Sequence, residues 1–210
     1  MSALKPIVVY HANGGPNPYK VLIALAELNL PYTKTAVSDV KGGEFCKINP
    51  NGRVPAIMDP NNDDLILWES GAIVEYLVET YDKEGKLSLP GNREKWMLKQ
   101  YLHFQMSGQG PYFGQAVWFY RQSEPNVQAK ERYIDQVVRV LGVLDGILKD
   151  REYLHVRGLS FIPWNRVALG APFFKEELWD KYDIATRFPN FVAWHERLNS
   201  RASVKTAYEL

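Results

Sequence analysis

The sequence has very little cysteine and no long apolar segment. Cys46 is the only cysteine among 210 residues, which excludes an intrachain disulfide and fits a reducing compartment. No apolar run approaches the ~18 residues that a membrane-spanning helix needs, and no charged-then-apolar leader opens the chain. We therefore expect a cytoplasmic protein that neither spans nor enters a membrane.

An excess of charge and a metal-binding pattern are also missing. The formal net charge is +1 and no long block carries one sign, so the electrostatic footprint of a nucleic-acid binder is absent. The four histidines are scattered without metal-ligand spacing: His11, His103, His155 and His195. Chemistry on small molecules, without a metal, is the expectation.

What the first 85 residues contain is an alternation of strand-like and helix-like segments. A β-branched run leads into a helix for which Asn17 suits the N-cap and Pro18 the first helical position. The expected strands are 6–10, 31–37, 53–58 and 65–67, and the expected helices are 17–28, 44–48 and 72–81. This order predicts an α/β thioredoxin-like domain over residues 1–85.

From Arg93 onward the strand pattern ends and helical patterns follow. The segment 86–92, with Pro90-Gly91, suits a linker, so residues 93–210 are predicted to form an all-α domain. The expected helices are 93–122 (broken near Gly108 and Gly110-Pro111), 124–149, 159–167, 175–182 and 189–199. In 124–149 one face is apolar: Ile134, Val137, Val138, Leu141, Leu144 and Leu148.

Two short segments combine features of a binding site. Pro55 begins a strand and pushes Val54 to extended geometry. If the Val54–Pro55 bond is cis, the backbone N–H and C=O of Val54 face outward and can pair with an extended peptide. Ser70 opens a helix, where its hydroxyl and the unpaired N–H groups form a carboxylate-binding site.

Four motifs give the chain a resemblance over nearly its full length. They are Gly15–Val21, Asn49–Ala56, Trp68–Ile73 and Phe104–Pro111. In these motifs the chain resembles the cytosolic glutathione transferases. The first and fourth are most similar to the nu-like branch, which includes fungal enzymes and a regulatory protein of yeast, so a fungal source is indicated.

The resemblance implies a domain that binds glutathione, a helical domain that helps to shape a second-substrate pocket, and a homodimer. By position, Val54 would pair with the cysteinyl part of glutathione beside a cis Pro55, and Glu69 and Ser70 would hold the γ-glutamyl end. Lys41 is the nearest match to the residue that meets the glycyl carboxylate. Arg53 positions the loop, makes an intersubunit contact or is simply solvated.

The chemical task is to keep the glutathione sulfur as a thiolate, starting from a thiol pKa of about 8.5. A drop of roughly two units needs about 2.7 kcal/mol, which one amide donor at a helix start can supply.

Asn17 is such a donor, placed where nu-like relatives keep an Asn, although an ordinary capping role is the alternative. Tyr10 is the competitor, since other classes use a tyrosine there; otherwise it is a plain strand aromatic. The hydroxyl that many transferases carry in this loop is replaced by Gly14 and Gly15.

Other residues have two interpretations. Tyr112, Phe113 and Phe119 are candidates for an apolar substrate pocket, but aromatics at helical spacing are more often core or interface residues. Cys46 beside no obvious base is more often a small buried residue than a redox nucleophile.

One segment departs from the family pattern. Tyr153–Ser160 is shorter than in relatives and lacks the Ser/Thr-x-x-Asp capping box that begins a buried helix there.

We predict a glutathione transferase that conjugates small electrophiles or reduces disulfides and peroxides. The alternative is a glutathione-binding regulator or ligand carrier without useful turnover.

Overall fold

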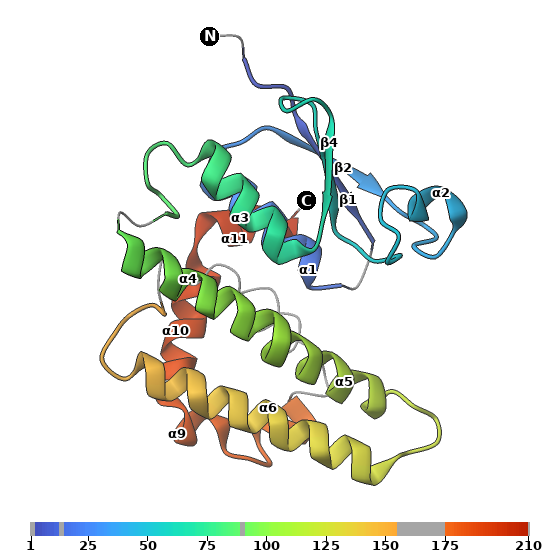
Figure 1. The fold of residues 1–210 in the computed structure, drawn as a ribbon. Helices are drawn as coiled ribbons and strands as arrows, with labels where there is room; N and C mark the ends of the chain where they lie inside the picture. The colour runs from blue at the N-terminus through green and yellow to red at the C-terminus, as the bar shows by residue number, and fades with distance from the viewer. Residues whose placement is uncertain (1–2, 13–14, 89–90, 155–174, 210) are drawn as a thin grey trace. The chain divides into compact units, whose positions relative to one another are not determined.

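The internal contacts of the chain divide it into two units. The computed structural model describes residues 3–12, 15–88, 91–154 and 175–209. The first unit comprises Met1–Pro90 together with Ala202–Leu210, and the second comprises Gly91–Arg201. All strands of the described ranges lie in the first unit (Figure 1).

The first unit is built on a four-stranded sheet in the order β2-β1-β3-β4. Its strands are β1 (Ile7–His11), β2 (Tyr32–Ala36), β3 (Ala56–Asp59) and β4 (Leu65–Trp68). β1 and β2 are parallel, and β3 is antiparallel to both of its neighbours. With α1 (Asn17–Glu27), α2 (Gly43–Cys46) and α3 (Ser70–Tyr81), this arrangement confirms the thioredoxin-like prediction.

Three helices gather on one side of this sheet (Figure 1): α1, α3 and α11 (Ala202–Glu209). α1 packs against both others. The rings of Tyr19 and Tyr208 stack with centroids 4.1 Å apart, and the Ser203 hydroxyl donates to Glu27 Oε1 at 2.5 Å. The sequence-based division grouped this last helix with residues 93–210, whereas its contacts group it with the first unit.

The second unit contains only helices in its described residues. They are α4 (Asn92–Phe104), the π-helix η1 (Gln105–Gln109), α5 (Gly110–Tyr120), α6 (Val127–Leu148), the π-helix η3 (Lys175–Trp179), α9 (Ile184–Arg187) and α10 (Pro189–Ser200). The predicted break near Gly108 is confirmed, since the π-helix separates α4 from α5. α5 and α10 both pack on α6.

Several details differ from the predicted helices. On α6 the buried residue is Val140 rather than Val138, which is only half-buried. The predicted helix 175–182 is a π-helix that ends at Trp179, and α9 was not predicted. The predicted helix 159–167 and most of the shortened segment, 155–160, lie outside the described residues.

Candidate functional site

The strand register brings the predicted site residues to one end of the sheet. Ala56 in β3 pairs with Trp68 in β4 and with Tyr10 in β1. The residues just before Ala56 and just after Trp68 therefore lie at the same end as the exit of β1. In this way Val54–Pro55 and Glu69–Ser70 converge beside the end of β1.

The loop before Val54 is held by a buried asparagine. Asn49 is 2% exposed; its side chain accepts from the Asn51 N–H at 3.0 Å and donates to the Arg53 C=O at 2.6 Å. Gly52 has φ +59°, and a Cβ there would lie 2.8 Å from the Val40 carbonyl oxygen, so a side chain does not fit. This turn fixes the direction in which the chain enters Val54.

Lys41 lies against the same loop. Its Nζ donates to the Asn51 C=O at 3.0 Å, which places an exposed ammonium close to the turn that precedes Val54. The Arg53 side chain is exposed. Half-buried Cys46 lies nearby, with Sγ 3.6 Å from the Lys41 C=O, as a weak donor.

The Val54–Pro55 peptide bond is cis, as the family resemblance implied. Pro55 is buried and Val54 is half-buried. Within the described ranges, no residue hydrogen-bonds to the N–H or the C=O of Val54. One backbone donor and one acceptor are thus available to a ligand at the start of β3.

The N-terminus of α3 lies across from Val54 and also keeps open groups. The exposed Glu69 has φ +71° and precedes Ser70, which is 5% exposed. No side chain caps the helix, and the first bonded N–H is that of Ile73, to the Glu69 C=O at 2.9 Å. The unpaired N–H groups of the first turn favour an anion at this position.

Lys20 of α1 lies beneath this helix start. It is 2% exposed, and its Nζ donates to Ser70 Oγ at 3.0 Å. Burial lowers the pKa of Lys20 to about 7, although the charge of Glu69 opposes the shift. Sequence reasoning missed this residue. The available signal was its position four residues before the buried Ala24, on the apolar face of the helix.

The two candidates for the thiol partner differ in their surroundings. α1 begins at Asn17 and Pro16 occupies the N-cap position without a side-chain cap bond, so the expected N-cap role of Asn17 is wrong by one residue. The reason is that Pro16 already has helical geometry, with φ −74° and ψ −28°. The ring of Tyr10 lies 6.1 Å from that of Phe45 on α2, a packing contact.

The three pocket candidates all lie on α5 in the second unit. Phe113 is 0% exposed and packs in the core of that unit. Tyr112 is half-buried with the Arg139 guanidinium 5.7 Å from its ring centroid, and Phe119 stacks on Tyr133 at 5.5 Å. Only Tyr112 and Phe119 keep exposed surface for a ligand.

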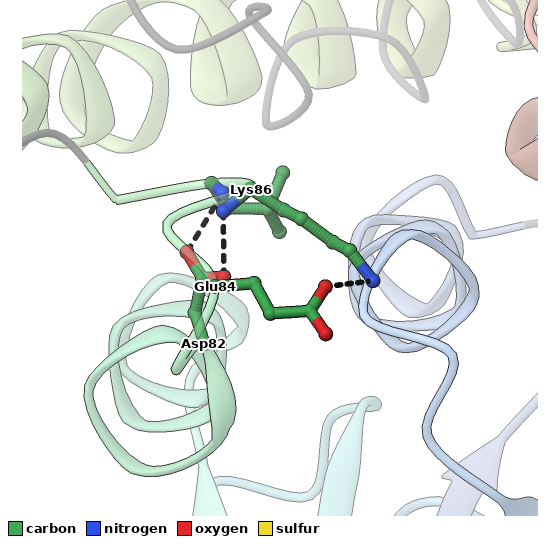
Figure 2. Close-up of polar contacts among 4 residues, drawn as sticks. Asp82, Glu84 and Lys86 are labelled. Carbon is green, nitrogen blue, oxygen red and sulfur yellow. Dashed lines mark hydrogen bonds and ion pairs between the residues drawn. The ribbon is translucent and has the colours of Figure 1, made fainter.

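Two carboxylates that sequence reasoning did not single out fix the opposite end of α3. Asp59 accepts from the hydroxyls of Tyr76 and Tyr81 at 2.6 and 2.5 Å, and from Asn61 through its N–H and its side-chain amide. Asp82 accepts from the N–H groups of Lys86, Leu87 and Ser88 at 2.7, 2.7 and 2.6 Å. Figure 2 shows the bond from Lys86. These bonds anchor the helix to the sheet and order the chain that follows it.

The pKa values of both carboxyl groups are lowered. Burial alone would raise the pKa of Asp59, but the hydrogen bonds from Tyr76, Tyr81 and Asn61 outweigh it. The same balance holds for Asp82, where burial is outweighed by the backbone N–H groups. Each carboxylate is therefore more stable as an anion in the folded chain than in water.

The described ranges lack two kinds of feature. No helix there is both long and apolar enough to cross a membrane. No group of three or more metal-ligating side chains occurs among those same residues.

Comparison with known proteins agrees with this architecture. The family profile of the glutathione S-transferase N-terminal domain matches residues 5–79. Glutathione S-transferase 2 of Schizosaccharomyces pombe is 46% identical over 218 residues, which cover 96% of this chain and 94% of the relative. The crystal structure of the glutathione transferase URE2P8 from Phanerochaete chrysosporium, with oxidized glutathione, matches with a TM-score of 0.89 at 34% identity, covering 100% of this chain and 96% of that one.

The chain therefore belongs to the glutathione S-transferase family. Within it, the similarity extends to the Ure2-like proteins of fungi: Protein URE2 of Candida albicans is 35% identical over 247 residues, which cover 95% of this chain and 68% of the relative. This agrees with the resemblance to the nu-like branch.

Proposed function

We propose that the protein binds glutathione at the end of the sheet where Val54, Glu69 and Ser70 converge, and that it activates the glutathione thiol. The observation that carries this proposal is the unpaired backbone N–H and C=O of Val54, facing an uncapped helix start in the same unit. A short peptide with a carboxylate at each end fits this arrangement. The crystal structure of a similar transferase with oxidized glutathione supports it.

Each part of glutathione has a partner in this arrangement. The cysteinyl backbone pairs with Val54, and the γ-glutamyl carboxylate accepts from Ser70 and the first N–H groups of α3. Glu69 attracts the γ-glutamyl amino group. Lys41, close to the turn before Val54, meets the glycyl carboxylate, with Arg53 alongside.

The thiol is activated at the start of α1. Asn17 donates to the sulfur, and the helix N-terminus adds its positive potential, so that the thiolate is the stable form near neutral pH. The contact of Tyr10 with Phe45 supports a packing role for that ring. The thiolate then forms a bond to an electrophilic carbon and displaces a leaving group with its electron pair. Alternatively, it attacks one sulfur of a disulfide and displaces the other as a thiolate, or it attacks the terminal oxygen of a hydroperoxide, breaks the O–O bond to form a sulfenic acid, and displaces an alkoxide that takes up a proton.

The remaining parts of the function follow the family. Tyr112 and Phe119 contribute to the site of a hydrophobic or electrophilic second substrate. The protein acts as a homodimer, and a cytoplasmic location is consistent with its single cysteine.

Replacement of the two thiol candidates tests the mechanism. We expect Asn17→Ala to lower turnover at least tenfold, because a charge-assisted hydrogen bond contributes about 1.5–3 kcal/mol. Tyr10→Phe should change turnover little. Steady-state kinetics with glutathione and a chloronitrobenzene measures both, and the reverse pattern would reassign the role to Tyr10.

The second candidate function is a glutathione-binding regulator or ligand carrier. The observation that favours it is the presence of Gly14 and Gly15 where many transferases supply a hydroxyl. An assay panel with a chloronitrobenzene, a hydroperoxide and a mixed disulfide separates the two functions. Failure of all three reactions, with glutathione binding retained in calorimetry, would favour the regulator. Absence of any binding at millimolar glutathione would exclude both.

A further inference from the structure

We propose that Lys20 is a positioning residue of the γ-glutamyl subsite, which orients the Ser70 hydroxyl and takes up a proton when a ligand carboxylate binds. This inference rests on the proposed glutathione function and adds a residue and a pH dependence to it. Lys20 lies within the motif Gly15–Val21, but the sequence alone assigns it no role.

The hydrogen-bond geometry gives the first argument. The Lys20 ammonium donates to Ser70 Oγ at 3.0 Å, so one lone pair of this oxygen is occupied by the lysine. A hydroxyl has one proton to donate, and no described residue accepts it. That proton is therefore left for an incoming acceptor at the N-terminus of α3, which is where the γ-glutamyl carboxylate is proposed to lie.

Charge gives the second argument. Lys20 is 2% exposed, and the negative charge of Glu69 partly opposes the effect of burial on its pKa. Since burial brings the pKa of Lys20 to about 7, only part of the population carries the charge at neutral pH. A carboxylate bound at Ser70 adds a second negative charge close to Nζ, which raises that pKa. Ligand binding and proton uptake are then linked.

Other titratable groups lie on the elements packed against α1. They include Tyr10 and His11 on β1, Glu75, Tyr76, Glu79 and Tyr81 on α3, and Lys205 and Tyr208 on α11. The amino group of glutathione titrates in the same range. The contribution of Lys20 must therefore be obtained as a difference between variants that share all these groups.

The experiment is calorimetry with S-methylglutathione, whose blocked sulfur removes the thiol from the proton balance. Titrations at pH 8 in two buffers of different ionisation enthalpy give the number of protons taken up. At pH 8 a pKa of about 7 leaves Lys20 about one-tenth protonated in the free protein. If that pKa rises by one to two units on binding, the wild-type protein takes up about 0.4–0.8 proton through this residue. Lys20→Arg keeps the charge but does not titrate, so its uptake should be smaller by that amount.

Affinity gives an independent readout. At pH 7 we expect Lys20→Met to weaken S-methylglutathione binding about tenfold, because a charge beside the ligand carboxylate is lost. The wild-type affinity should fall toward that of Lys20→Met as the pH rises to 9, whereas Lys20→Arg should show a smaller fall. Lys83→Met, which removes an exposed lysine after α3, should bind as the wild type does.

The outcomes separate the two proposals. Tight wild-type binding with equal proton uptake in wild type and Lys20→Arg would overturn the role of Lys20 and leave the glutathione site standing. Failure of wild type to bind the ligand would overturn the proposed function, and the Lys20 inference with it. If Lys20→Arg does not fold, the same subtraction is made with Lys20→Met, which also does not titrate, and equal proton uptake in that variant and the wild type contradicts the inference.

Discussion

The two ends of α3 use polar side chains in opposite ways. At the end near Tyr81, Asp59 and Asp82 accept hydrogen bonds from side chains and backbone of the same chain. At the other end, Ser70 keeps a proton without an acceptor in the described ranges, and Glu69 has a positive φ. We call the end of α3 with Asp59 and Asp82 the closed end, because its carboxylates are hydrogen-bonded within the chain. The end with Glu69 and Ser70 is the open end, because it keeps groups for a ligand.

The pKa values express this difference in free energy. Hydrogen bonds lower the pKa of Asp59 and Asp82, which means that the folded state stabilises their charged forms. Burial lowers the pKa of Lys20, which means that the folded state destabilises its charged form. The stabilising free energy of Asp59 and Asp82 at the closed end therefore offsets the free-energy cost of the buried Lys20 charge at the open end.

The largest predicted effect is at the closed end. Asp59→Asn removes the negative charge that accepts from two tyrosines and Asn61. It also replaces one carboxylate oxygen by an NH₂ group, which points its own hydrogens at groups that donate hydrogen bonds in the wild type. Since a hydrogen bond to a charged group contributes about 1.5–3 kcal/mol, we expect a loss of about 3 kcal/mol or more in the free energy of unfolding. Urea denaturation measures it.

A matched control and a binding measurement sharpen the comparison. Asp63→Asn, on the exposed turn between β3 and β4, should stay within about 0.5 kcal/mol of the wild type. Folded Asp59→Asn should bind glutathione with unchanged affinity, since the open end is intact. A stable Asp59→Asn protein with weakened binding would show that the two ends are not separate in role.

A smaller effect of opposite sign is expected at the open end. The ordinary pKa of a lysine is 10.5, and that of Lys20 in the fold is about 7, so the unfolded chain binds more protons between these values and stability rises with pH there. This linkage gives the wild type up to about 3 kcal/mol between pH 7 and pH 10. Lys20→Met lacks it and should melt at a higher temperature at pH 7, although it binds glutathione more weakly.

Thermal unfolding of both proteins at pH 7 and pH 9.5 checks this prediction. The difference in melting temperature should be large at pH 7 and small at pH 9.5. Lys83→Met serves as the reference for removal of a lysine from the surface. If Lys20→Met were less stable than the wild type at both pH values, Lys20 would belong with the closed, stabilising groups.

The sequence predicted the fold well because the signals are local. The strands and α3 follow from alternating apolar residues, from Pro55 at a strand start and from Ser70 at a helix start. The motifs of Asn49–Ala56 and Trp68–Ile73 also located the candidate site, since strand register alone brings Val54 and Ser70 together. These features are encoded within a few residues of one another.

The residues that were missed depend on contacts between distant segments. Lys20 and Ser70 are 50 positions apart, and Asp59 meets Tyr81 across 22 positions. The docking of α11 on α1 joins Glu27 to Ser203 over 176 positions. A polar residue on an apolar helix face indicates that a buried partner exists, but only the packed structure identifies it.

The smallest predicted effect concerns Asp82, which orders the chain after α3 (Figure 2). Asp82→Asn keeps one acceptor oxygen, and we expect a loss of about 1–2 kcal/mol at pH 7. Because the folded pKa is lowered, the contribution of Asp82 is complete above its unfolded pKa of about 3.9 and is lost as the pH falls through the folded value. Urea unfolding at pH 7, 5 and 3 should show the difference between wild type and variant shrinking only at pH 3.

The neighbouring ion pair of Glu84 and Lys86, at 2.9 Å with the glutamate side chain 73% exposed, supplies the control, since Glu84→Gln should change stability by about 0.5 kcal/mol or less. Equal losses in the two variants would mean that the exposed pair, and not the backbone N–H groups gathered on Asp82, orders this segment.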